Sequence, residues 1–150
     1  MLIAFPAALS LIPCNSVYFR GWRDNMSKLI YKKESYKIRG AAFEVYKEMG
    51  SGFVEPVYQE CMEKELARSE VPFKSQVGLV LSYKGEKLEH TYKPDLICFN
   101  KIVVELKAVS ELLPEHEAQL MNYLSATNMK LGFLVNFGSH PSVQIERRAL

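Results

Sequence analysis

Three side chains on two neighbouring strand-like segments could form a metal site. Asp95 opens the apolar segment 95–99, and Glu105 and Lys107 lie in the segment 102–109, which is rich in β-branched residues. A loop at 99–101 would pair position 95 with position 105, where cross-strand Cβ atoms are about 5 Å apart. Two carboxylates at that distance repel each other, whereas Mg²⁺ or Mn²⁺ would coordinate both and keep several waters.

The same side chains suit the hydrolysis of a phosphodiester bond. Lys107 lies about 6.5 Å beyond Glu105 along the strand and shares its face. A metal held by the carboxylates would activate water, and the ammonium would stabilise the developing charge. For an isolated Glu-x-Lys, the alternative is a surface ion pair on an amphipathic strand. The register also sets Lys93 opposite Lys107, which requires a bulge at Pro94.

The elements that must position these residues alternate between helices and strands. Helical spacing of apolar residues predicts three helices, at 36–49, 54–69 and 114–127. Alternating or continuous apolar runs predict strands at 73–83, from 87 into 95–99, at 102–109 and at 131–137. Residues 143–149 leave two alternatives open, with and without a further edge strand. Turns are expected at 84–86 and 99–101. The order predicts an α/β fold with a mixed central sheet flanked by helices.

Two of the predicted helices carry polar side chains that could face a site. Glu55 lies beside the apolar stripe of its helix, and a partly buried carboxylate needs a partner or a metal. Glu44, the competing carboxylate, points away from the stripe of its own helix. In the helix that follows Pro114, His116, Gln119 and Tyr123 share one face. If this helix faces the site, the shared face accounts for all three polar side chains. In the alternative, Tyr123 is a core residue, His116 a surface residue and Gln119 a solvated residue at the rim.

Composition describes an ordinary globular chain. Its 150 residues, 48% hydrophobic and 24% charged, suit one domain. The net charge of +2 creates no overall basic field, so any contact with nucleic acid must be local. The three cysteines lack C-x-x-C spacing, which argues against a disulfide framework or a zinc site and indicates a reducing compartment, by default the cytoplasm.

The first 25 residues differ from the remainder. Residues 1–15 carry no charge, which raises the alternative of a signal peptide. The segment has no positive n-region, is interrupted by Pro6 and Pro13, and is too short to span a bilayer. We therefore expect residues 1–25 to be a flexible extension or to precede the true start at Met26, residues 26–150 to form the domain, and no membrane segment.

Four motifs in this order resemble those of a known superfamily. They are Gly52-Phe53-Val54-Glu55-Pro56-Val57-Tyr58, Pro94-Asp95, Glu105-Leu106-Lys107 and Gln119-Leu120-Met121-Asn122-Tyr123. Together they resemble the PD-(D/E)xK nuclease superfamily, and more closely its GxxExxY protein family, over residues 36–150. The last motif is similar to the Q-x-x-x-Y element of the recombination-exonuclease branch.

This resemblance implies a nuclease-like fold in the order α-α-β-β-β-α-β and a role for each site residue. Asp95 and Glu105 would ligate Mg²⁺ or Mn²⁺ with Glu55 completing the shell, and Lys107 would orient or activate water. Gln119 and Tyr123 would position the scissile phosphate or support Lys107, and His116 is a further candidate; the complete set is Glu55, Asp95, Glu105, Lys107, His116, Gln119 and Tyr123.

The implied activity is metal-dependent phosphodiester hydrolysis, with DNA as the expected partner and RNA as the alternative. Because the superfamily includes members that bind without cutting, a catalytically silent nucleic-acid-binding or regulatory module is the second hypothesis. A scaffold subunit of a defence or mobile-element system is a third. The oligomeric state is open, a homodimer included.

Overall fold

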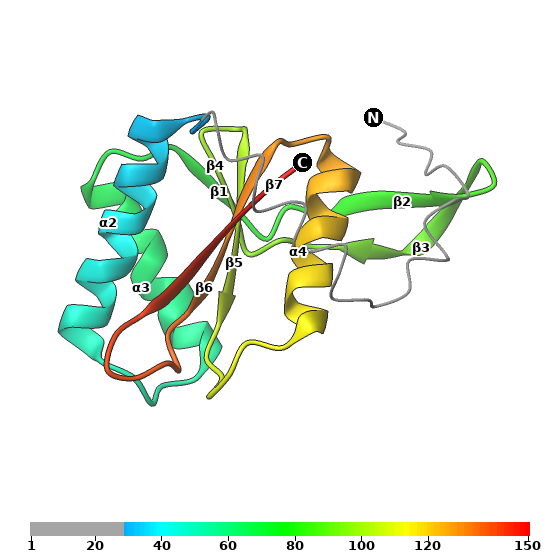
Figure 1. The fold of residues 1–150 in the computed structure, drawn as a ribbon. Helices are drawn as coiled ribbons and strands as arrows, with labels where there is room; N and C mark the ends of the chain where they lie inside the picture. The colour runs from blue at the N-terminus through cyan, green and yellow to red at the C-terminus, as the bar shows by residue number, and fades with distance from the viewer. Residues whose placement is uncertain (1–28) are drawn as a thin grey trace.

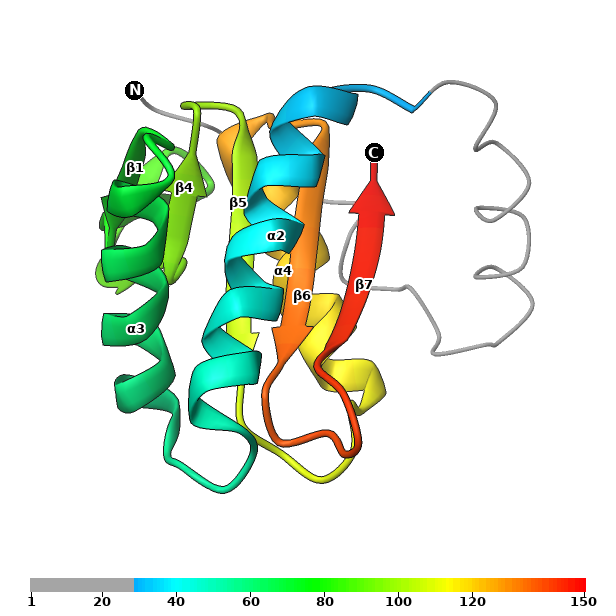
Figure 2. The same ribbon diagram turned by 90° about the vertical axis from the view of Figure 1, so that its left-hand side faces the viewer.

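A computed structural model describes residues 29–150, so the predicted extension at 1–25 lies outside the described residues. Two helices, α2 (Lys32–Met49) and α3 (Glu55–Arg68), cover one face of a five-stranded sheet, and α4 (Pro114–Thr127) covers the other (Figure 1). Figure 2 shows α2 and α3 side by side in front of the sheet with α4 behind it. The predicted α/β fold with helices flanking a mixed sheet is confirmed.

The main sheet has the strand order β1-β4-β5-β6-β7. Its strands are β1 (Phe73–Ser75), β4 (Leu96–Cys98), β5 (Ile102–Lys107), β6 (Leu131–Asn136) and β7 (Gln144–Ala149). Only the β5–β6 pair is parallel, and α4 is the crossover that a parallel connection needs. This arrangement puts β5 in the centre of the sheet.

The central position of β5 gives its two faces different neighbours. Val104 and Leu106 belong to the core beneath α2 and α3, whereas Val103 packs with Leu120 and Leu124 of α4. Successive strand residues point to opposite faces, so Glu105 and Lys107 lie on the α4 side with Val103. Both faces are covered, and the alternative of a surface ion pair on an exposed strand is therefore wrong.

The predicted strand at 73–83 is wrong, because these residues form two strands of different sheets. β1 ends at Ser75, and Gln76 adopts a left-handed backbone with φ 51° before β2 (Leu79–Tyr83) begins. β2 pairs only with β3 (Glu86–Tyr92), and the two form a ribbon that extends beyond α4 (Figure 1). The predicted tight turn of this hairpin is confirmed at Lys84 and Gly85, with φ 49° and 86°.

The strand predicted from 87 into 95–99 is confirmed in its two parts, but its continuity is wrong, because the two parts belong to different sheets. β3 stops at Tyr92, and Lys93 and Pro94 lead from the ribbon into β4 of the main sheet. Pro lacks the N–H that a continued ladder would require. Lys93 therefore pairs with no residue of β5, and the predicted clash with Lys107 does not arise.

None of the helices within residues 29–150 combines the length and the apolar character that crossing a membrane requires.

Candidate active site

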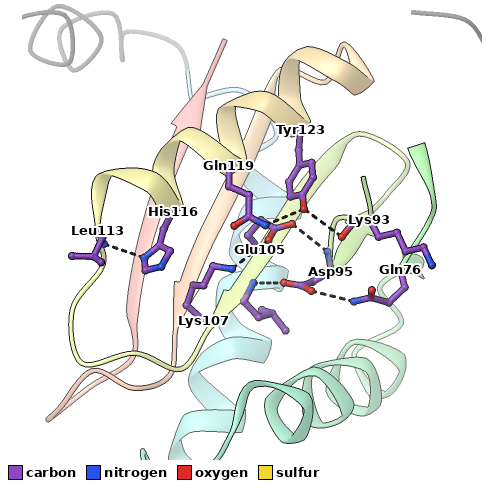
Figure 3. A network of polar contacts seen from close by, with 10 residues as sticks. Gln76, Lys93, Asp95, Glu105, Lys107, Leu113, His116, Gln119 and Tyr123 are labelled. Carbon is purple, nitrogen blue, oxygen red and sulfur yellow. Dashed lines mark hydrogen bonds and ion pairs between the residues drawn. The ribbon is translucent and has the colours of Figure 1, made fainter. Parts of the chain in front are cut away.

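Asp95 and Glu105 meet where β4 and β5 begin to separate, in the register that the sequence predicted. Leu96 pairs with Val104, so the next position along each strand brings residue 95 opposite residue 105. The Asp95 N–H donates to Glu105 Oε1 at 3.3 Å, and Asp95 Oδ2 accepts from the Leu106 N–H at 2.8 Å. Lys107 Nζ lies 3.9 Å from Glu105 Oε2 (Figure 3).

Glu105 is the least solvated of these groups, with 1% of its surface exposed. Burial first, and then the charge of Asp95, raise the pKa of its carboxyl to about 9, with Lys107 opposing them only in part. Glu105 therefore holds a proton at neutral pH in the metal-free protein. A cation that bound to this pair of carboxyl groups would displace the proton of Glu105, because a carboxyl must lose its proton to ligate a metal.

Two glutamines that the sequence patterns did not single out hold Asp95 in place. Gln76 Nε2 donates to Asp95 Oδ1 at 3.1 Å, and the Gln76 N–H donates to the Asp95 carbonyl oxygen at 3.1 Å. Gln59 Nε2 donates to the same carbonyl at 3.2 Å. Gln59 follows Glu55 by one helical turn, a spacing that could have pointed to it. Gln76 carried no such signal, because its role depends on the break between β1 and β2.

The motif around Gly52 and Tyr58 shapes the start of α3. Tyr58 is fully buried and stacks on Phe137, with ring centroids 4.5 Å apart and planes 5° from parallel. Its hydroxyl donates to the Gly50 carbonyl at 2.7 Å and accepts from the Phe53 N–H at 3.2 Å. Gly52 has φ 114°, a conformation that residues with a Cβ rarely adopt. Through these hydrogen bonds, Tyr58 fixes the loop that leads into α3, whose first residue is Glu55.

Glu55 is the first residue of α3 and is half-buried. Burial raises the pKa of its carboxyl, Lys107 and His116 lower it, and the charge of Asp95 raises it, so Glu55 lies within electrostatic range of all three. Glu44, by contrast, is exposed and pairs with Lys47 at 3.5 Å. The structure thus places Glu55 where the charges of Asp95, Lys107 and His116 shift its pKa, whereas Glu44 faces solvent.

The polar face of α4 closes the site from above the sheet in Figure 3. Gln119 Nε2 donates to the Tyr123 hydroxyl at 3.0 Å, and that hydroxyl donates to the Lys93 carbonyl at 3.4 Å. Burial raises the pKa of Tyr123 to about 12, so the phenol stays protonated and remains a donor. Its ring also meets Tyr92 edge-on, with centroids 4.8 Å apart, which anchors the β2–β3 ribbon to the site.

The donor set fits a hard divalent cation. Asp95 and Glu105 supply adjacent carboxylate oxygens, the ligand type that Mg²⁺ and Mn²⁺ prefer. Among residues 29–150, no three Asp, Glu, His or Cys side chains are close enough together to hold a metal ion without movement. Completion of the shell by Glu55 therefore stays a prediction, as do the roles of Lys107, Gln119 and Tyr123.

Comparison with known proteins gives a family match and two structural likenesses. A family model for the PD-(D/E)XK nuclease superfamily matches residues 32–148. The crystal structure of SSO0001 has a TM-score of 0.53 and 19% identity, over 63% of this chain and 48% of that one. The chain thus spans about half the length of that protein, and the likeness concerns the fold alone.

A second likeness is weaker. The crystal structure of an alkaline exonuclease from Laribacter hongkongensis has a TM-score of 0.46 and 10% identity, over 81% of this chain and 71% of that one. No curated protein matches the sequence. Membership of the narrower GxxExxY family therefore stays a prediction.

Proposed function

Because the chain belongs to the PD-(D/E)XK nuclease superfamily, we propose that it is a nuclease that hydrolyses phosphodiester bonds in DNA with the help of a divalent metal ion. Nucleases of this superfamily generally use divalent metals. The observation that carries the proposal is the buried Glu105 carboxyl, held against Asp95 and 3.9 Å from the Lys107 ammonium. A fold gains no stability from that arrangement, whereas a metal and a phosphate would compensate all three groups.

The site residues would have different roles in the reaction. Asp95 and Glu105 would hold Mg²⁺ or Mn²⁺ together with Glu55, and the ion, when bound, activates water and neutralises phosphate charge. Lys107, with 12% of its side chain exposed, keeps its ammonium where a water-poor site strengthens its effect on the developing charge.

Gln119 and Tyr123 complete this assignment on the α4 side. Their mutual hydrogen bond fixes the phenol against the Lys93 carbonyl, next to the strands that carry the carboxylates. From there they would position the scissile phosphate or support Lys107. Correct placement of the phosphate matters because a reacting group misplaced by about 1 Å can cost about 100-fold in rate.

DNA is the proposed substrate polymer, with RNA as the alternative. The cytoplasmic location is likewise a proposal, and it rests on the cysteine pattern; Cys61 and Cys98 are both free thiols.

The test is cleavage of labelled single-stranded, duplex and branched oligonucleotides, in DNA and RNA versions, with Mg²⁺, Mn²⁺ or chelator. Wild type should cleave with metal and not with chelator. Binding without cleavage under every condition would favour the silent nucleic-acid-binding module instead.

Glu55→Gln and Glu44→Gln form a matched pair for the third carboxylate. Glu55→Gln should lose metal-dependent cleavage and the rise in melting temperature that metal causes, because it removes a proposed ligand. Glu44→Gln should keep both, since Glu44 is exposed and paired with Lys47. The reverse result would move the assignment to Glu44.

A further inference from the structure

His116, in the first turn of α4, is held through only one of its ring nitrogens. Its Nδ1 accepts the Leu113 N–H at 3.0 Å, and its own N–H donates to the Leu113 carbonyl at 3.0 Å. This reciprocal contact begins the helix and fixes the plane of the imidazole. Because the Nδ1 lone pair is occupied, the neutral ring carries its hydrogen on Nε2.

The Nε2–H group is a donor on the site side of α4. His116 shares a helical face with Gln119 and Tyr123, and Figure 3 shows its ring below α4, on the side where Lys107 lies. His116 also lowers the pKa of Glu55, which places the two groups within electrostatic range. Within residues 29–150, the Leu113 contact is the one hydrogen bond of this side chain, although the ring is half-buried.

An N–H with no partner among the described residues can donate to an acceptor that arrives from outside. On the side of α4 where Figure 3 shows both His116 and Lys107, the acceptor that the N–H and the ammonium would both favour is an anionic oxygen. On these grounds we propose that His116 donates a hydrogen bond from Nε2 to a phosphate oxygen of the nucleic acid. This inference rests on the proposed function, and it makes His116 a substrate-contacting residue rather than only a helix cap.

Two substitutions separate the cap from the substrate contact. In His116→Asn, the amide oxygen occupies the position of Nδ1 and can still accept the Leu113 N–H, but nothing replaces Nε2. In His116→Ala, both the acceptor for the Leu113 N–H and the Nε2 donor are lost. Asparagine therefore preserves the cap without the substrate contact, whereas alanine removes both.

The experiment measures three quantities on wild type and both variants. They are the melting temperature, the affinity for a labelled duplex oligonucleotide in chelator by fluorescence anisotropy, and the cleavage rate with Mg²⁺. His116→Asn should melt as wild type does, bind about fivefold more weakly, as expected for one hydrogen bond, and cleave about 100-fold more slowly. His116→Ala should melt at a lower temperature, because the cap is lost, and should bind and cleave no better than His116→Asn.

The outcomes separate this inference from the proposed function. If His116→Asn binds and cleaves as wild type does, His116 is a helix cap and the inference is overturned. If wild type binds without cleaving and His116→Asn binds more weakly, the phosphate contact stands and the nuclease proposal fails. If wild type neither binds nor cleaves, both fail.

Discussion

Replacing Glu105 by Gln should stabilise the metal-free protein at neutral and alkaline pH and abolish its response to metal. Glutamine keeps an oxygen that can accept the Asp95 N–H but carries no charge at any pH. The substitution therefore removes the cost of keeping a buried carboxyl protonated at pH values where the unfolded chain releases the proton. It also removes a proposed metal ligand and should leave the protein inactive.

The pKa shift sets the size of the effect. The ordinary pKa of the carboxyl is 4.5, and the folded protein raises it to about 9. Between these values the unfolded chain releases a proton that the folded protein retains, so stability must fall as pH rises. At about 1.36 kcal/mol per unit of pKa, wild type loses up to about 3 kcal/mol of stability from this group between roughly pH 5 and 7.5. This loss of stability is absent below pH 4.5, the ordinary pKa of the carboxyl, and complete above about pH 9, its pKa in the folded protein.

Denaturant unfolding in chelator at several pH values between 5 and 9 measures this cost. The free energy of unfolding of wild type should fall relative to that of Glu105→Gln as the pH rises from 5 to 9. At pH 5 the two proteins should be nearly equally stable. Added Mg²⁺ or Mn²⁺ should stabilise wild type alone, because a ligand that binds only the folded state stabilises it. Metal binding near pH 7 should release about one proton, measurable by calorimetry in buffers of different ionisation enthalpy. Parallel pH profiles for the two proteins would refute the buried-carboxyl argument.

Three further substitutions and one control test other parts of the structure. Lys107→Met should keep the metal-induced rise in melting temperature while cleavage falls by about 100-fold or more, because Lys107 is assigned to the chemical step; loss of the metal response would instead make it part of the metal site. Tyr58→Phe should cost about 1–3 kcal/mol in denaturant unfolding, because two backbone groups lose their partner; an unchanged midpoint would contradict the proposed role of this hydroxyl. Gly132→Ala should cost about 1–3 kcal/mol, because a Cβ there would lie 2.7 Å from Leu120 Cδ1. Gly40→Ala is its control and should gain about 0.5–1 kcal/mol, because among the described residues the added carbon meets nothing within 4 Å beyond the backbone of its own helix.

The sequence alone was enough for features that depend on neighbours along the chain. The register of Asp95 against Glu105 follows from the short loop between β4 and β5, because a tight connection leaves few alternative pairings. The bounds of α4 were readable from Pro114 and from the apolar spacing that follows it. Superfamily membership was likewise recognisable, since its motifs are short and ordered along the chain.

Only the tertiary structure decided which distant segments meet. The alternation of residues 73–83 fits one strand, but β1 pairs with β4 and β2 with β3, and local periodicity contains no information about the partner of a strand. The contacts of Gln76 and Gln59 with Asp95 follow from that pairing and from the packing of α3. The pKa of Glu105 depends on helices covering both faces of β5, because burial is a property of the assembled layers and not of the strand.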